Sequence, residues 1–245
     1  MAAGGLVRRL QQPPWLGLLA FAVTFTWKPT AHAISVLSHG LLHGAALGAA
    51  YTTFGLLGFA LVWLGFRRDE LTASFLGFFG GALIFMFWIE PSFALFAERM
   101  GLEPLRHHGQ VYLSPNLVLM ESSAVVFLVV LVLLGANKDT RCRMFMWFHR
   151  NFRLRPNRPT PGYRRQYSRI AAMETIFVSW FFYIVIIGAV DPRLLGPAHP
   201  LTRLLTAAMF AWGVYLVGFK LPGLQAMGEA FRYAIAVAGV LWFCV

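Results

Sequence analysis

The sequence predicts an all-α protein, a polytopic bundle of transmembrane helices that forms a single domain over residues 1–245. Of its 245 residues, 58% are apolar and only 13% are charged, and its mean hydropathy is +0.62. Soluble domains carry about 25% charged residues, so this chain has too few to cover a surface that faces water. The composition also excludes a disordered chain and a disulfide-rich secreted scaffold. An integral membrane protein remains.

Stretches of about 20 mostly apolar residues, the length that a helix needs to cross a bilayer, recur along the chain. The first is interrupted by Lys28, Pro29 and His32, and the last contains Glu229 and Arg232, which we interpret as a self-neutralising pair at helical spacing. We predict seven spans, at Pro14–Leu37, Leu41–Phe66, Leu71–Ala97, Val111–Leu134, Ile170–Val190, Leu201–Phe219 and Leu221–Val245.

Most lysines and arginines fall in alternate loops, which by the positive-inside rule predicts an N-terminus inside and a C-terminus outside. The cell inner membrane is the predicted location. In an alternative, residues 1–33 are a cleaved signal peptide with the small-residue site Ala31-His32-Ala33, which leaves six spans. The Arg-rich cytoplasmic loop at residues 137–169 predicts contact with anionic lipid head groups or with a membrane-protein partner, and no nucleic acid.

Besides Glu229, three glutamates lie inside the predicted spans, where a charged side chain costs about 2.5–3.5 kcal/mol and is a functional candidate. Glu90 and Glu121 enter from the outer side on consecutive antiparallel helices, so they can meet at similar depth. Glu174 lies near the inner end of the fifth span, where Arg169 offers an interfacial ion pair. The pair Glu90 and Glu121 is therefore the main candidate for chemistry.

Histidines gather on the same outer side. His32, His39 and His43 share one face if their stretch is a continuous helix, and His107-His108 lies in the loop between the third and fourth spans. Histidine is the side chain best suited to change charge near neutral pH. Together with the glutamates, these residues predict a Glu/His cluster in the outer half of the bundle.

Two chemistries fit such a cluster, and both predict an enzyme that acts on a hydrophobic lipid or isoprenoid. In the first, acid–base catalysis isomerises or cyclises an alkene, because one carboxyl donates a proton and a second group accepts one. The predicted catalytic residues are Glu90, Glu121, His39 and His43. Nearby aromatic rings could stabilise a developing carbocation by cation–π contact, namely Phe85, Phe87, Trp88 and Phe93.

In the second chemistry, the cluster holds a metal and performs an oxidation. The candidate ligands are His39, His43, His107 and His108, and the candidate groups are iron, copper or haem. A different class of function is a non-catalytic subunit of a membrane complex that binds haem, a pigment or a metal. The sequence leaves open whether any cofactor is present.

The segment around Glu90 resembles part of the emopamil-binding protein family, the sterol Δ8–Δ7 isomerases. The resemblance rests on the pattern I-E-x-x-F-x-L-x-x-E at residues 89–98 and on Met120-Glu121 in the following helix. It covers a small part of the chain, and Met86 stands where the family has a histidine. The resemblance implies protonation of a sterol-like double bond, with Glu90 and Glu121 as candidate acid and base.

Overall fold

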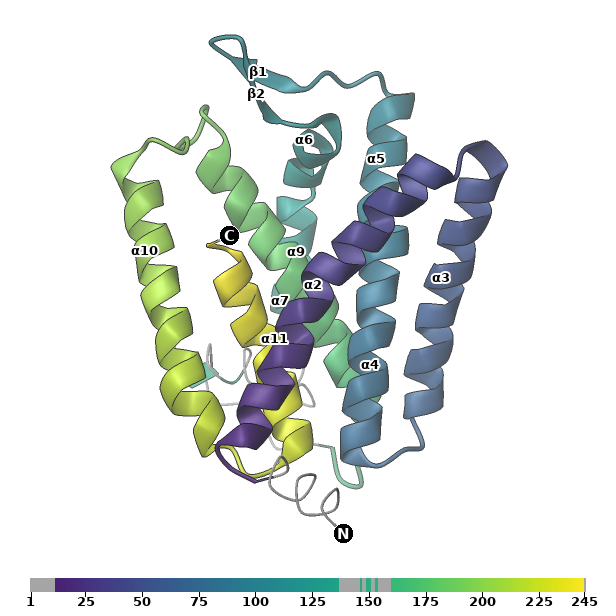
Figure 1. The fold of residues 1–245 in the computed structure, drawn as a ribbon, viewed down its shortest axis with the longest axis vertical. Coiled ribbons are helices and arrows are strands. Elements are labelled where there is room, and N and C mark those ends of the chain that lie inside the picture. Colours follow the sequence, from purple (N-terminus) through teal and green to yellow (C-terminus); the bar gives the residue numbers. More distant parts are fainter. Residues whose placement is uncertain (1–11, 137–145, 147–148, 151–152, 154–159, 245) are drawn as a thin grey trace.

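The computed structural model describes residues 12–136, 146, 149–150, 153 and 160–244, and in these ranges the protein is mostly helical (Figure 1). Four helices are long and apolar enough to cross a membrane, and a fifth span results if one bent pair of helices counts as one. Long helices run side by side between two ends of the bundle. This arrangement is that of a multi-pass membrane protein.

The elements follow one another as antiparallel helices, with one short β-hairpin at the end of the bundle that carries the α2–α3 junction (Figure 1). In chain order they are α2 (Trp15–Leu41), α3 (Gly44–Gly65), α4 (Glu70–Ile84), the π-helix η1 (Phe85–Ile89), α5 (Glu90–Arg99), β1 (Leu105–His107), β2 (Gln110–Leu113), α6 (Pro115–Ser122), α7 (Ala124–Ala136), α9 (Tyr167–Val190), α10 (Pro200–Tyr215), the π-helix η2 (Leu216–Lys220), the 3-10 helix η3 (Leu221–Gly223) and α11 (Met227–Trp242).

The second, third, fifth and sixth predicted spans are confirmed as helices of spanning length and apolarity. The fourth differs, because Val111–Leu113 is part of β2 and the remainder bends by 42° between α6 and α7. The left-handed backbone of His108 and Gly109 closes the hairpin in two residues, which suits a tight turn between antiparallel strands. The protein is therefore mostly helical rather than all-α.

Helix α2 runs unbroken through Pro29, which lies inside the first predicted span. Proline has no N–H, so the carbonyl of Phe25, four residues earlier, loses its helical partner. The indole Nε1–H of Trp242 donates to this carbonyl oxygen at 3.0 Å, and the Phe25 and Trp242 rings stack with centroids 5.1 Å apart. An indole from the last helix thus replaces the missing hydrogen bond of the first.

We expect Trp242→Phe to lower the free energy of unfolding by about 1–2 kcal/mol, because it leaves a carbonyl inside the bundle unsatisfied. In a Pro29→Ala background the restored N–H of residue 29 can serve the same carbonyl, so the loss should shrink. Denaturant unfolding in mixed micelles measures both, with the exposed Trp15→Phe as the control. If Trp242→Phe costs the same stability in both backgrounds, the Trp242 indole does not replace the hydrogen bond that is missing at Pro29.

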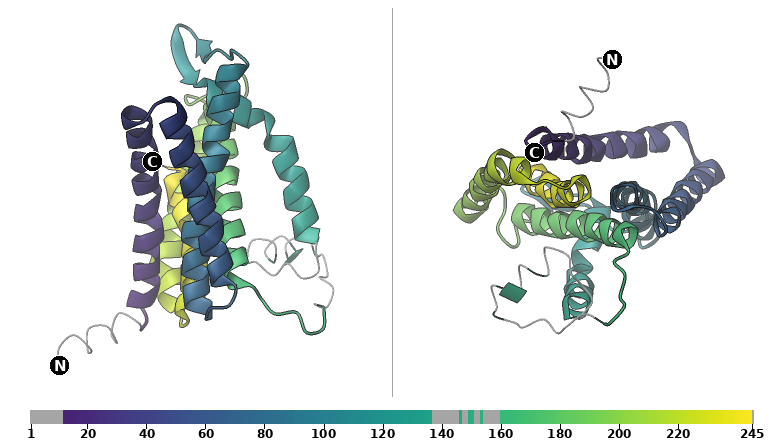
Figure 2. Two further views of the ribbon diagram at one scale, coloured as in Figure 1. Left: turned by 90° about the vertical axis from the view of Figure 1, so that its right-hand side faces the viewer. Right: turned by 90° about the horizontal axis from the view of Figure 1, so that it is seen from below.

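The centre of the bundle is the crossing of α4 and α9, which lie side by side in Figures 1 and 2. A side chain at Gly77 would collide with the backbone of Ser168, and one at Gly81 with the backbone of Ala172. The hydroxyl of Ser168 also donates to the carbonyl of Val62 in α3 at 2.8 Å. Small residues therefore let three backbones approach closely, as is common between membrane helices.

Helix α7 stands apart from the other helices (Figure 2). Its contact with α9 is made by Phe127, whose ring packs against Phe177 and Trp180 with centroids 5.7 and 5.5 Å away. The other large side chains of α7 that the structure describes are mostly exposed and apolar. In a bilayer such a surface contacts lipid tails.

At the opposite end of the bundle, Arg232 of α11 reaches α4. Its guanidinium forms an ion pair with Glu70 at 2.6 Å, donates to the hydroxyl of Ser74 at 2.6 Å, and lies over the ring of Tyr167, 4.6 Å from its centroid. The sequence paired Arg232 with Glu229, one turn away on the same helix. In the structure, the ion pair of Arg232 with Glu70 joins α11 to α4.

Candidate functional site

A cavity of about 400 Å³ lies between α2, α4, α9 and α11. Its wall is mainly apolar and aromatic, with the buried ring of Phe85 at its inner side. His32 and Ala33 also line it and are exposed, so the cavity reaches the surface of the bundle beside α2. Ligand pockets have about this size and this mostly apolar character.

Polar groups enter the cavity from two sides. Helix α2 contributes Lys28 and His32, one turn apart, and α9 contributes Thr175, Ser179 and Tyr183 at a spacing of four residues. Residues four apart share a helix face, so each helix presents one polar stripe to the cavity. Of these residues the sequence analysis named Lys28 and His32.

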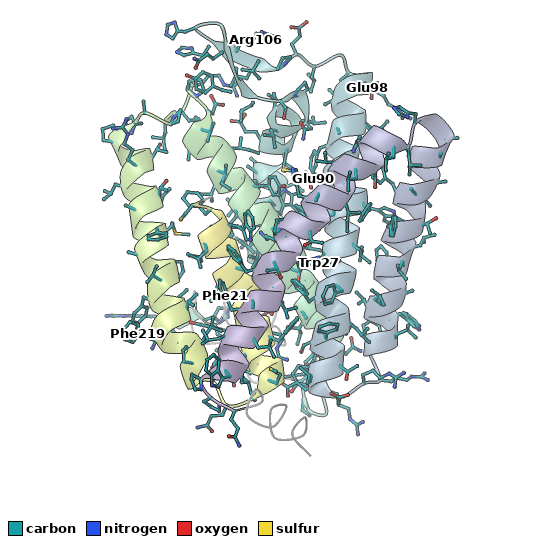
Figure 3. The ribbon with its side chains drawn as sticks, viewed as in Figure 1. Phe21, Trp27, Glu90, Glu98, Arg106 and Phe219 are labelled. Carbon is teal, nitrogen blue, oxygen red and sulfur yellow. The ribbon has the colours of Figure 1, made fainter. Side chains whose placement is uncertain are left out.

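Glu90 lies nearer the hairpin end of the bundle than Trp27, a residue of the cavity wall (Figure 3). The hydroxyl of Tyr183, whose side chain lines the cavity, donates to Oε1 of Glu90 at 3.4 Å. Oε2 is buried and has no hydrogen-bond partner within the described ranges. One carboxyl oxygen therefore remains available for a proton or a ligand.

The backbone at Glu90 is unusual because a π-helix, η1, precedes it. Pro91 cannot donate to the carbonyl of Phe87, and the helix widens so that the N–H of Glu90 bonds to the carbonyl of Phe85 instead. Wide turns of this kind occur frequently at functional sites. Both Phe85 and Met86, the residues five and four positions before Glu90, line the cavity, so Glu90 follows them on that side of the helix.

A second set of polar contacts adjoins Glu90 from α2 and α3. The hydroxyl of Tyr51 lies 2.6 Å from Nδ1 of His39, and the indole of Trp88 donates to the carbonyl of Tyr51 at 3.1 Å. His32, His39 and Tyr51 are all close enough to interact electrostatically with the Glu90 carboxylate. The predicted cluster of Glu90 with histidines of α2 stays a prediction.

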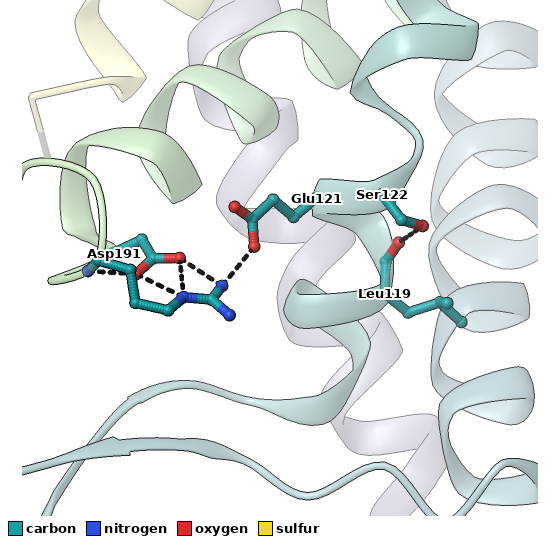
Figure 4. Close-up of polar contacts among 5 residues, drawn as sticks. Leu119, Glu121, Ser122 and Asp191 are labelled. Atoms are coloured by element: carbon teal, nitrogen blue, oxygen red, sulfur yellow. Dashed lines mark hydrogen bonds and ion pairs between the residues drawn. The ribbon is translucent and has the colours of Figure 1, made fainter.

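Glu121 has different partners from the predicted one (Figure 4). Its Oε2 accepts from Nη2 of Arg193 at 2.8 Å, and Arg193 also binds Asp191 through Nη2 at 2.5 Å and through its backbone N–H at 2.7 Å. No hydrogen bond or ion pair joins Glu121 to Glu90. The two glutamates thus have different hydrogen-bond partners, and sequence analysis missed Asp191 because it adjoins the fifth span instead of lying inside it.

Charge and burial explain the cluster around Arg193. Asp191 has no exposed side-chain surface and sits at the C-terminus of α9, where the helix dipole disfavours a negative charge. The hydrogen bond from Arg193, together with its charge, holds the pKa of Asp191 below its usual range, and Asp191 in turn raises the pKa of Arg193. Both groups therefore stay charged at neutral pH.

We expect Arg193→Met to lower the free energy of unfolding at pH 7 by about 1–2 kcal/mol. The loss is smaller than for a fully buried pair, because 53% of the Arg193 side chain is exposed and solvent screens it. A depressed pKa stabilises the folded state above the unfolded value near 4, and this contribution disappears as pH falls through the folded pKa. The deficit should therefore shrink at about pH 3.

Denaturant unfolding at the two pH values measures this deficit, with the exposed hairpin residue in Arg106→Met as the control. A deficit that is the same at both pH values would contradict a stabilising charge interaction between Arg193 and Asp191.

The four histidines proposed as metal ligands lie at one end of the bundle but not together. His43 precedes α3 with extended backbone and is exposed, and the rings of His107 and His108 meet edge to face in the hairpin, centroids 4.1 Å apart. His39 lies in the last turn of α2, which ends at Leu41. His43 follows that end and therefore does not continue the helix face of His39. Within the part of the chain that the structure describes, no three residues of the His, Cys, Asp or Glu type form a group that could hold a metal ion.

Of the four aromatic residues predicted to surround a carbocation, only Phe85 lines the cavity. Phe87 stacks on Phe54, and the ring of Phe93 packs against Trp180, 6.4 Å between centroids. Other aromatic residues take their place in the cavity wall. They are Trp27, Phe78, Phe182, Tyr183 and Trp242.

Fold and site together define a multi-pass membrane protein with a mainly apolar cavity and a buried carboxyl beside it. Comparisons with protein-family models, with curated proteins and with solved structures find no match to this chain. The resemblance around Glu90 and Glu121 therefore stays a prediction.

Proposed function

We propose that the protein is an integral membrane enzyme that binds a hydrophobic lipid or isoprenoid in this cavity and transfers a proton through Glu90. The observation that carries the proposal is the Glu90 carboxyl, which is held by the cavity-lining Tyr183 and leaves Oε2 buried without a partner in the described structure. A carboxyl in such surroundings suits general acid catalysis, since burial favours its protonated form.

The proposed reaction is isomerisation or cyclisation of an alkene. The π electrons of the alkene take the proton of Glu90 to form a C–H bond, and the aromatic wall stabilises the carbocation that results. Loss of a proton from a neighbouring carbon to His32 then restores an alkene. One proton is added and one removed, so no oxidant or reductant is needed.

The exchange of protons gives a test that does not require the natural substrate. Purified protein is incubated in D₂O with a panel of sterols and polyprenyl lipids, and carbon-bound deuterium is measured by mass spectrometry. We expect a lipid of the panel to gain deuterium with native protein and not with heat-denatured protein. Equal labelling in the two samples for every lipid would contradict the proposed function.

We further propose that α2 and α11 also span the membrane, which gives seven spans with the N-terminus inside and the C-terminus outside. Leu16, Ala20 and Thr24 of α2 are buried, and α11 is largely buried too, as expected for helices inside a bundle. In this proposal α2 is a membrane span of the mature protein and not part of a cleaved signal peptide. The Arg-rich loop at residues 137–169 lies mostly outside the described residues, and its contact with anionic lipids at the inner membrane stays a prediction.

A further inference from the structure

Lys28 is a charged residue that the proposed proton transfer does not use. It is the central residue of the 27-residue α2 and lines the cavity. No hydrogen bond or ion pair joins its ammonium group to any residue that the structure describes. Charged side chains within membrane helices are usually paired, because an isolated charge is unfavourable in an apolar medium.

The surroundings of Lys28 have the form of a head-group site followed by a tail site. The hydroxyl of Ser179 faces the same cavity from α9. The rest of the wall is mainly apolar and includes Phe85 and Tyr183, and Tyr183 holds Glu90. The positive charge of Lys28 thus stands on the wall of a mainly apolar cavity, and the carboxyl of Glu90 adjoins that wall through Tyr183.

We infer that the cavity binds a single-chain amphiphile with an anionic head group, whose charge pairs with the Lys28 ammonium. The inference rests on the proposed function, since it names the head group of the substrate at the same cavity. The chain of the amphiphile lies along the aromatic wall and brings its double bond to Glu90. The opening at His32 and Ala33 admits the molecule from the lipid around α2.

A carboxylate and a phosphate monoester share this chemistry, and binding experiments distinguish them. Three probes with the same chain are hexadecanoate, hexadecyl phosphate and the uncharged hexadecan-1-ol. Binding to the purified protein in an uncharged detergent is measured by native mass spectrometry and by the rise in unfolding temperature that a ligand causes. We expect at least one anionic probe to bind at least tenfold more tightly than the alcohol, and the tighter of the two identifies the head group.

Variants of Lys28 test the pairing. Lys28→Met should weaken binding of the preferred anion at least tenfold and leave binding of the alcohol unchanged, whereas Lys28→Arg should retain most of the affinity. Lys220→Met is the matched control, because Lys220 is an exposed lysine that lies over the ring of Tyr215, outside the cavity. The affinity of the Lys220→Met protein for every probe should equal that of the wild type.

Two results would overturn the inference. One is equal affinity of the wild type for the alcohol and both anions, which needs no variant and so holds even where Lys28→Met fails to fold. The other is unchanged affinity of a folded Lys28→Met protein for the anion. Because binding is measured without turnover, loss of anion binding and absence of deuterium transfer are separate outcomes, so failure of this inference differs from failure of the proposed function.

Discussion

Glu90→Gln is expected to lower the incorporation of deuterium into lipid by a factor of about 10²–10⁴, the contribution typical of a general acid or base. Glutamine has nearly the same shape as glutamic acid and can still accept the hydrogen bond from Tyr183, but it cannot donate or take up the transferred proton. The fold and the cavity should therefore survive while the chemistry is lost. Rates of labelling in D₂O measure the effect.

Matched controls exist in the same region of the chain. Glu98→Gln changes an exposed glutamate at the C-terminal end of the same helix and should leave the labelling rate within about twofold. Unfolding temperature checks that Glu90→Gln remains folded. A folded Glu90→Gln protein that labels lipid at the wild-type rate would show that Glu90 is not the proton donor.

Glu121 provides a contrast within the predicted pair. Because its carboxylate accepts from Arg193 at 2.8 Å and is partly exposed, Glu121→Gln removes a charge from this ion pair rather than from the cavity. Position in the sequence placed both glutamates at similar depth, and the role of Glu90 stays a prediction. Position in the sequence could not identify the partner of Glu121, since that partner comes from the loop after α9.

The cavity itself could be predicted only in part. Span length and apolarity located most of the helices, because the bilayer imposes one length and one composition on each of them. Which helix faces meet depends on side-chain fit between distant segments, which periodicity does not encode. Lys28 was visible as a charge within the first span, and the structure places it on the wall of the cavity between α2, α4, α9 and α11.

Local sequence signals explain two of the remaining differences. The pair His108-Gly109 favours a tight hairpin turn, and Pro115 begins a new helix, so the segment before α6 is a β-hairpin rather than the start of a span. Pro29 lies inside α2 without ending it. Its effect is cancelled by Trp242, which lies at the other end of the chain and therefore escapes any local analysis.

Because α4 and α9 approach closely, Gly77→Ala is the substitution for which we expect the largest loss of stability. The added methyl group would overlap with the backbone carbonyl of Ser168, and neither helix backbone can yield without moving the other. Alanine gains about 1 kcal/mol over glycine in a helix, but overpacking of this kind costs more. We expect a net loss of about 2–3 kcal/mol in the free energy of unfolding.

Gly48→Ala is the control for this prediction, because Gly48 lies in α3 with open space around it and should be stabilised by up to about 1 kcal/mol. Denaturant unfolding of the two variants in the same micelles measures the difference. Since Tyr183 on α9 holds Glu90 on α5, which continues α4, a separation of the two helices at Gly77 should also lower the rate of deuterium transfer. A Gly77→Ala protein as stable as the Gly48→Ala protein would show that the two backbones are not in contact, and the position assigned to Glu90 would lose its support.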